Sequence, residues 1–150
     1  MKLAAVLATK GTRVATIPAN VSVAEAVATL AARNIGALVV TGPDGAVAGI
    51  ISERDIIRAL AAGQPLRALA VAEVMTSPVV CGALEDDIEP VLATMTARHF
   101  RHLPVVDGGQ LVGLVTTGDL AQALLQSLAG RVETLELRLE AEIEQFGVGR

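Results

Sequence analysis

Two short segments carry a hydroxyl and a carboxylate side chain at the same spacing. They are Ser52–Asp55, read as SERD, and Thr116–Asp119, read as TTGD. Each follows a short apolar run and opens a run of helical periodicity, so each lies where a strand passes into a helix. A hydroxyl and a carboxylate one helical turn apart could bind the vicinal hydroxyls of a ribose, and free helix N–H groups could bind phosphate. The same spacing is the signature of a helix capping box, and each segment taken alone favours capping.

The two segments belong to an internal repeat. A shift of 65 positions aligns Val14, Ala28, Thr29, Ala32, Arg33, Leu38 and Val40 with identical residues at 79, 93, 94, 97, 98, 103 and 105. After one residue is dropped in a Gly/Asp turn, the shift becomes 64 and aligns Gly45, Gly49, Asp55, Ala59 and Leu60 with identical residues at 109, 113, 119, 123 and 124. A duplicated unit with a hydroxyl and a carboxylate at one place in both copies favours a binding role over capping alone.

Each half is predicted to have the same order of elements, β-α-β-β-α. In the first half an extended segment at 14–17 precedes a helix at 23–33, strands at 37–40 and 47–51, and a helix that begins at Asp55. The corresponding segments of the second half are 79–81, 88–98, 103–106 and 111–115, with a helix that begins at Asp119. A short Ala-rich helix at 70–75 joins the halves. Because a unit of about 60 residues cannot bury both faces of a three-stranded sheet alone, we expect the halves to pack together.

The two halves resemble a pair of cystathionine-β-synthase (CBS) domains. The resemblance rests on Ile35–Leu60 (IGALVVTGPDGAVAGIISERDIIRAL) and Phe100–Leu124 (FRHLPVVDGGQLVGLVTTGDLAQAL), and it covers about residues 7–125. With Lys10 and Gly11 ahead of the first strand, the chain is similar to small stand-alone bacterial CBS-pair proteins related to mitochondrial and plastid regulators of plants. The resemblance implies an α/β (α+β) fold of tandem repeats packed as a pseudo-twofold module. We expect the first repeat at 7–62, a linker helix at 63–75, the second repeat at 76–125 and a C-terminal amphipathic helix at 126–150.

The resemblance also implies two clefts for adenosine-containing ligands: AMP, ADP, ATP or NAD(H), with S-adenosylmethionine as a further candidate. In the family an acidic residue binds the ribose hydroxyls, and the hydroxyl residue beside it contacts sugar or phosphate. The first extended segment of each repeat reads the adenine edge with its backbone, and the start of the next strand contacts the base. The positions matched in this way are Asp55 and Asp119 for ribose, Ser52 and Thr116 beside them, Thr16 and Cys81 for the adenine edge, and Ala37 and His102 against the base.

Further positions complete the implied nucleotide-binding set. Lys10 and Gly11 align with Met75 and Thr76 as the edges of the two clefts. Phosphate partners are expected where the clefts meet near the pseudo-twofold axis. These partners are Arg54, Arg58, Arg101 and His102, and Pro104 and Gly118 are included with the set.

Three departures from the family pattern bear on the site. Gly118 stands where the first segment has Arg54, so the two clefts should differ in charge. The stretch that begins at Cys81 lacks the usual proline, which weakens the expected strand contact of the second site. With two Phe and no Tyr or Trp, adenine is expected to lie between aliphatic groups.

Beyond Gln122 the apolar residues recur every three or four positions: Leu124, Leu128, Val132, Leu135, Leu139 and Ile143. This spacing predicts an amphipathic helix of about 20 residues or more. The helix could dock on its own module or pair with the same helix of a second chain, and two to three heptads do not decide between these alternatives.

Composition and motifs also disfavour several classes of function. The net charge of −4 and the scarcity of aromatics disfavour a nucleic-acid partner. No apolar run reaches the ~20 residues of a membrane span, so no membrane partner is expected. The short N-terminal apolar stretch and the single Cys81 are typical of a cytoplasmic protein. His99 and His102 lack further ligands at metal spacing, so no metal site is expected.

The sequence contains no nucleophile–base pair, so we expect no catalytic residue, no catalytic cofactor and no enzymatic activity. The predicted function is a ligand-sensing regulatory module, a homodimer that modulates an unidentified partner protein. The alternative is an adaptor for interaction or dimerisation that needs no ligand.

Overall fold

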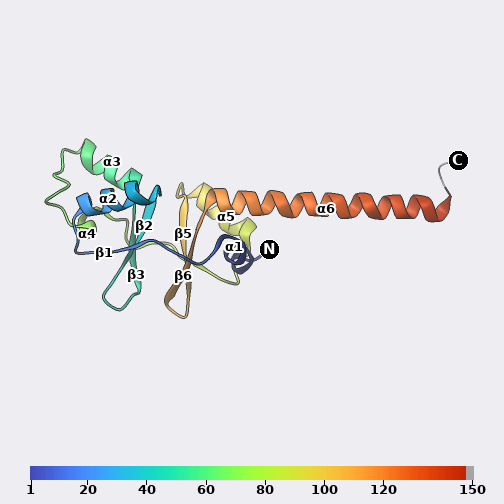
Figure 1. Ribbon diagram of the computed structural model, residues 1–150, viewed down its shortest axis with the longest axis horizontal. Coiled ribbons are helices and arrows are strands. Elements are labelled where there is room, and N and C mark those ends of the chain that lie inside the picture. Colours follow the sequence, from blue (N-terminus) through green and yellow to red (C-terminus); the bar gives the residue numbers. More distant parts are fainter. Residues whose placement is uncertain (148–150) are drawn as a thin grey trace.

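The computed structural model describes residues 1–147 as two similar halves, with one long helix projecting from the second (Figure 1). The first half contains β1 (Thr16–Pro18), α2 (Val23–Arg33), β2 (Ala37–Thr41), β3 (Val47–Ser52) and α3 (Glu53–Ala61). The short α4 (Val71–Val74) leads to β4 (Gly82–Ala83), α5 (Ile88–Ala97), β5 (His102–Asp107) and β6 (Gln110–Thr116). The chain begins with α1 (Leu3–Lys10) and ends with α6 (Thr117–Phe146). The mixed α/β class and the tandem β-α-β-β-α order are confirmed.

Each half contains one three-stranded sheet, ordered β1-β2-β3 in the first and β4-β5-β6 in the second. The first strand is parallel to the second and the third is antiparallel to it. Register is equivalent in the two halves, since Ala37 lies opposite Ser52 and His102 lies opposite Thr116. The strands of each sheet therefore bring the hydroxyl residue to the same edge, directly before the helix that carries the carboxylate.

Several boundaries differ from the sequence prediction. Of the linker helix expected at 63–75, only α4, Val71–Val74, is helical. The closing helices begin at Glu53 and Thr117 and not at the aspartates, because Ser52 and Thr116 are the N-caps. The extended segment expected at 79–81 is not a strand, and pairing starts only at Gly82, which aligns with Val105.

Each sheet packs in its own hydrophobic core, and each core is completed by a helix from outside the β-α-β-β-α unit. The first core includes Val71 of α4, which is fully buried. The second core includes Leu3, Val6 and Leu7 of α1, although α1 precedes the first half in the chain. The sequence did not predict a helix at α1.

The docking of α1 on the second half repeats that of α4 on the first. The backbone N–H groups of Val71 and Ala72 donate to the carbonyls of Val21 and Ala19, at 2.8 and 2.9 Å. Those of Leu3 and Ala4 donate to the carbonyls of Asp86 and Leu84, at 2.9 and 3.0 Å. Because Asp86 and Leu84 are the repeat equivalents of Val21 and Ala19 at the 65-residue shift, the two helices occupy equivalent places.

A glycine in each third strand permits this close approach. A Cβ at Gly49 would lie 2.8 Å from the carbonyl oxygen of Thr76, which follows α4. A Cβ at Gly113 would lie 2.6 Å from the methyl groups of Leu7 in α1. Both distances are too short for a side chain, so the two glycines hold equivalent positions for the same reason.

The sequence predicts a closing helix of the second half and a separate C-terminal helix. In the structure they form one continuous helix, α6, of 30 residues. Only its start packs on the module, through the buried Leu120 and the half-buried Ala123 and Leu124. Every residue from 128 to 147 is exposed. The last three residues of the predicted C-terminal helix, 148–150, lie outside the described residues. Within residues 1–147, none of the helices has the length and apolar character needed to cross a bilayer.

The docking of α1 predicts that its leucine side chains stabilise the second half. Leu3 is fully buried, so Leu3→Ala should lower the free energy of unfolding by about 2–5 kcal/mol, measured by urea denaturation. The matched control is Leu137→Ala, at a leucine 60% exposed on α6, which should change that free energy by no more than about 0.5 kcal/mol. Equal stability of the two variants would contradict the packing of α1.

Candidate functional site

The two hydroxyl–carboxylate segments are capping boxes, as one of the two interpretations of the sequence expects. In the first, the backbone N–H of Ser52 donates to Oδ2 of Asp55 at 2.9 Å, and Ser52 Oγ accepts from the backbone N–H of Asp55 at 3.5 Å. In the second, the backbone N–H of Thr116 donates to Oδ2 of Asp119 at 2.8 Å, and Thr116 Oγ1 accepts at 3.1 Å. Each cap therefore fixes one oxygen of a carboxylate at the end of a strand.

The second oxygen of Asp55 faces the segment that follows α4. The hydroxyl of Thr76 donates to Oδ1 of Asp55 at 3.1 Å. The backbone of Thr76 is fixed on β3, because its N–H and carbonyl both pair with Ile50, at 2.8 and 3.0 Å. A carboxylate, a hydroxyl and the N-terminus of α3 thus meet at one point.

A cleft of about 440 Å³ opens at this point and is lined by both halves. The first half and the segment after it contribute Gly36, Ile50, Ser52, Glu53, Arg54, Asp55, Arg58, Thr76, Pro78, Val79 and Val80. The second half contributes Arg98, His99, Phe100, Arg101 and His102. The cleft is large enough for a small-molecule ligand.

Basic groups dominate the cleft. Four arginines line it, against the two carboxylates of Glu53 and Asp55. Arg54 also spans the halves, since its Nη1 donates to the carbonyl of His99 at 3.5 Å. Burial, reinforced by the charges of Arg101 and Lys10, lowers the pKa of His102 below its ordinary value, so His102 is neutral at pH 7. The positive charge of the cleft at neutral pH therefore comes from the arginines.

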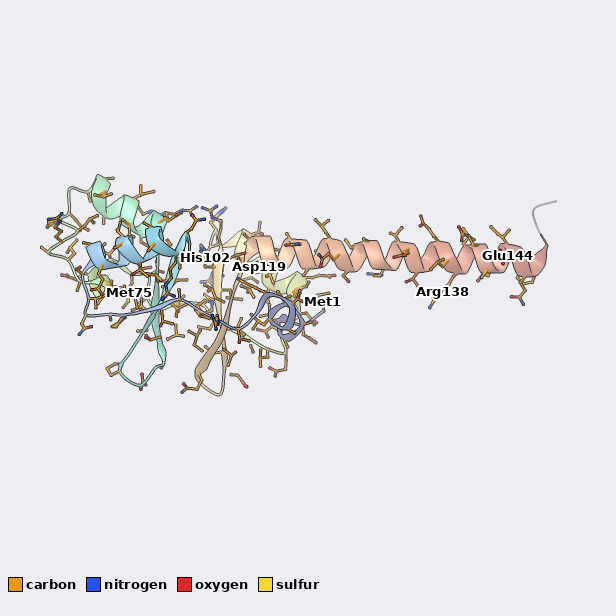
Figure 2. All side chains as sticks on the ribbon, viewed as in Figure 1. Met1, Met75, His102, Asp119, Arg138 and Glu144 are labelled. Atoms are coloured by element: carbon orange, nitrogen blue, oxygen red, sulfur yellow. The ribbon has the colours of Figure 1, made fainter. Side chains whose placement is uncertain are left out.

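The second segment has a different partner. Lys10, at the end of α1, donates from Nζ to Oδ2 of Asp119 and to the carbonyl of Leu114, the latter at 2.7 Å. Figure 2 shows Asp119 close to His102 near the middle of the module, where the halves meet. Burial opposes ionisation of Asp119, but the hydrogen bonds from Lys10 and Thr116 and the charge of Lys10 outweigh it and hold the pKa of Asp119 below its usual range.

Seven of the sixteen positions implied by the resemblance line the large cleft: Ser52, Arg54, Asp55, Arg58, Thr76, Arg101 and His102. A second group lies around Asp119: Lys10 and Thr116 contact it, and Gly118 precedes it on α6. The structure does not bring the remaining positions into the large cleft. Thr16 is exposed on β1, Gly11 is exposed after α1, Ala37 and Pro104 are buried in strands, and Cys81 lies elsewhere.

Cys81 lines a separate groove of about 260 Å³ beside β4 and α5. Its thiol is half-buried, and burial raises its pKa, so it is protonated at neutral pH. This state is typical of an unreactive cysteine. Among the described residues, no group of three or more His, Cys, Asp or Glu side chains could hold a metal ion.

The sequence did not predict some of the residues in the cleft wall. Arg98, His99 and Phe100 end α5 and reach the cleft from the second half, with His99 in the left-handed region at φ 58°. Phe100, one of the two phenylalanines, lies in this wall, so the cleft is not lined by aliphatic groups alone, and the aliphatic contacts expected for adenine stay a prediction. The repeat offered one signal for this turn, because His99 aligns with Asn34 and Asn is typical of the left-handed turn that ends a helix. Both residues have a left-handed backbone.

Comparison with known proteins supports the assignment of the two repeats. The family model of the CBS domain matches residues 8–62 and 71–126. The chain is similar to an uncharacterized 17.7 kDa protein of Acidianus ambivalens, with 37% identity over 150 residues that cover 95% of this chain and 86% of the relative. It is also similar to the CBS domain-containing protein YhcV of Bacillus subtilis, with 36% identity over 114 residues that cover 75% of this chain and 80% of YhcV.

Solved structures share the fold. The CBS-domain containing protein ATU1752 from Agrobacterium tumefaciens superposes with a TM-score of 0.77 at 38% identity, over 81% of this chain and 92% of that one. The CBS domain pair of protein MJ0100, solved in complex with 5-methylthioadenosine and S-adenosyl-L-methionine, superposes with a TM-score of 0.75 at 26% identity, over 85% of this chain and 98% of that one. Both repeats, their order and their packing agree with these relatives, and the chain belongs to the CBS domain family as a CBS pair.

Proposed function

We propose that this CBS pair is a regulatory module that senses a phosphate-bearing adenosine ligand, AMP, ADP, ATP or NAD(H), in the cleft around Asp55. The observation that carries the proposal is the composition of that cleft. A carboxylate already oriented by a cap lies in one wall, and four arginines from both halves lie around it. A ribose hydroxyl and a phosphate are the groups that such a pair of features binds.

The capping box supports a binding role for Asp55 and does not compete with it. The cap engages Oδ2, which fixes the plane of the carboxylate before a ligand arrives. Oδ1 accepts a hydroxyl hydrogen bond from Thr76, and a ribose hydroxyl could donate to the same oxygen. A receptor group held in its bound geometry loses little entropy on binding, which increases affinity.

Charge separates the candidate ligands. AMP, ADP, ATP and NAD(H) carry phosphate groups, whereas S-adenosylmethionine carries a sulfonium cation. With four arginines facing two carboxylates, the cleft favours an anion. MJ0100 binds S-adenosyl-L-methionine, but we expect this chain to prefer the phosphate-bearing ligands.

A regulatory role follows if the ligand favours one arrangement of the two halves. The cleft joins α3 of the first half to the end of α5 in the second, so a bound ligand would contact both. A ligand shifts a conformational equilibrium only by its difference in affinity for the two states. The link between Arg54 and the carbonyl of His99 is long, at 3.5 Å, and is the contact that a phosphate would replace first.

The proposal predicts that Arg58 contributes to ligand binding. Isothermal titration calorimetry with AMP, ATP, NADH and S-adenosylmethionine should give the highest affinity with a phosphate-bearing ligand. Arg58→Ala should weaken that binding by about 1.5–3 kcal/mol, tenfold or more in Kd, because a charge-assisted contact is lost. The matched control is Arg67→Ala, an exposed arginine outside the cleft, which should leave the Kd unchanged.

Asp55→Asn tests the ribose contact in the same titration. The amide oxygen of Asn can still accept the cap hydrogen bond from Ser52, so the variant should fold, while the charge that binds the ribose hydroxyls is removed. Absence of binding by wild-type protein at millimolar ligand would overturn the proposed function. Unchanged affinity in both variants would overturn the assignment of this cleft.

The structure also predicts how Lys10 controls Asp119. Lys10→Met should raise the pKa of Asp119 toward or above its ordinary value, because burial is then no longer outweighed, as measured by a carboxyl-carbon NMR titration. Since the folded pKa is depressed, the ionised Asp119 stabilises wild-type protein above its unfolded pKa. That contribution is lost as pH falls through the folded pKa. The stability difference between wild type and variant should therefore shrink in acid.

The control for this titration is Lys2→Met, because Lys2 pairs with the exposed Asp87 at 2.9 Å. Loss of this pair should raise the pKa of Asp87, which the hydrogen bond from Lys2 lowers, and leave Asp119 unchanged. An Asp119 pKa that is the same in Lys10→Met and wild type would contradict the role of Lys10.

A further inference from the structure

The projecting part of α6 exposes large apolar side chains that the module does not cover. They are Leu125, Leu128, Val132, Leu135, Leu139, Ile143 and Phe146, each between 44% and 72% exposed. Figure 1 shows that α6 extends straight away from the module, so these side chains have no surface of their own chain to contact. The projecting part of α6 therefore lacks the packing from which most helical stability in proteins comes.

The seven side chains form one stripe. At 3.6 residues per turn they fall within a sector of roughly 80° around the helix axis. Leu125, Val132, Leu139 and Phe146 take every seventh position, and Leu128 and Leu135 take the position three residues later, which are the a and d sites of a heptad repeat. Glu142 occupies the next d site, and Ile143 beside it supplies apolar surface there. The exposed Leu137 lies on the opposite side of the helix.

Charges of opposite sign flank the stripe. Arg131 and Arg138 lie along one edge, at the g sites. The other edge carries Glu136 at an e site, with further glutamates beyond it at 133, 140 and 144. Figure 2 shows Arg138 and Glu144 on the part of α6 that is clear of the module. The helix therefore has a basic edge, an apolar stripe and an acidic edge.

We propose that α6 binds α6 of a second copy of this chain as a parallel two-stranded coiled coil. In a parallel pair each g site faces the e site of the next heptad in the partner, so Arg131 meets Glu136 of the partner subunit, and the reciprocal pair forms by symmetry. In an antiparallel pair, g faces g and e faces e, which sets the basic edges against each other and the acidic edges against each other. Like charges at such positions are unfavourable, and the charge pattern selects the parallel arrangement.

This dimer is inferred from the residues of α6 alone and goes beyond the proposed ligand binding. A twofold axis along the coil makes the contact isologous and closed, so it ends at a dimer. Both modules then lie at the same end of the coil, because each is attached at the N-terminal end of its α6. The residues of the cleft around Asp55 are not part of the stripe, so the coil does not use them.

The first test compares two leucines of equal exposure on opposite sides of α6. Wild-type protein should sediment as a dimer in analytical ultracentrifugation. Leu135→Glu, at a d site 62% exposed, should raise the dimer dissociation constant at least tenfold. Leu137→Glu, at a site 60% exposed on the far side, should leave it unchanged. A monomeric wild type, a Leu135→Glu dimer of wild-type affinity, or equal weakening by both variants would overturn the proposal.

The second test addresses orientation. Arg131→Glu should weaken the dimer, and the double variant Arg131→Glu with Glu136→Arg should restore it, because the facing pair is then reversed but intact. In a Cys81→Ser background, Phe146→Cys should form an intermolecular disulfide on mild oxidation, since a parallel coil brings the two copies of position 146 together. A dimer that gives no such disulfide and no rescue would show that the pairing is not parallel. Thermal unfolding of each variant monitors the module separately, since these side chains are exposed and do not contact its cores.

Discussion

The crossed docking of two helices on the two halves is the contact on which the rest of the module depends. Helix α4 follows the first half and completes its core, while α1 precedes the first half and completes the core of the second. Neither sheet is covered by its own β-α-β-β-α unit alone. Because the second core needs a helix that precedes the first half in the chain, the two halves are linked both through α1 and through the segment that follows α4.

The same docking brings different residues to the two carboxylates. The chain leaves α4 at Thr76, whose hydroxyl contacts Asp55, and leaves α1 at Lys10, whose ammonium group contacts Asp119. Neighbouring positions of the repeat thus present a neutral donor in one half and a cation in the other, since Lys10 aligns with Met75 and Gly11 with Thr76. Asp55 lies in the cleft lined by four arginines, whereas Asp119 already pairs with Lys10 of its own chain. The duplicated scaffold therefore surrounds its two carboxylates with different groups, and Gly118 in place of Arg54 adds to the difference.

The sequence predicted the elements whose signals are local. Helix α2 has the predicted bounds because Ser22 caps it and Asn34 ends it, and both are visible in the sequence. The SERD segment was located with its capping role, which the structure shows, while its binding role stays a prediction. The elements that the sequence did not predict depend on tertiary contacts. Helix α1 has no capping side chain and little amphipathic pattern, so only its contact with the second core makes it a helix of this fold.

The residues of the cleft were also predicted only in part, because some of them reach it through tertiary contacts. The repeat and the family resemblance placed Arg54, Asp55 and Arg58, which lie close together on α3. The alignment of Lys10 with Met75 indicated the edges of the two clefts. Arg98 and Phe100 could not be placed, because nothing in the sequence says how far the end of α5 reaches across to the first half. Thr16, expected at the adenine edge, is exposed, and Ala37, expected against the base, is buried; neither lines the large cleft, and their roles stay predictions.

The capping boxes show why two interpretations of one motif can both hold. A carboxylate has two oxygens, and a helix cap uses one of them to accept a backbone N–H. In the first half the other oxygen accepts from the hydroxyl of Thr76 in the wall of the cleft, so the group that stabilises the start of α3 also lines the space between the halves. The cap holds the side chain in a single rotamer, which a solvent-exposed aspartate would not keep. Capping therefore supplies the rigidity that a binding carboxylate would require, and in the proposed function the surrounding arginines would select the ligand by its charge.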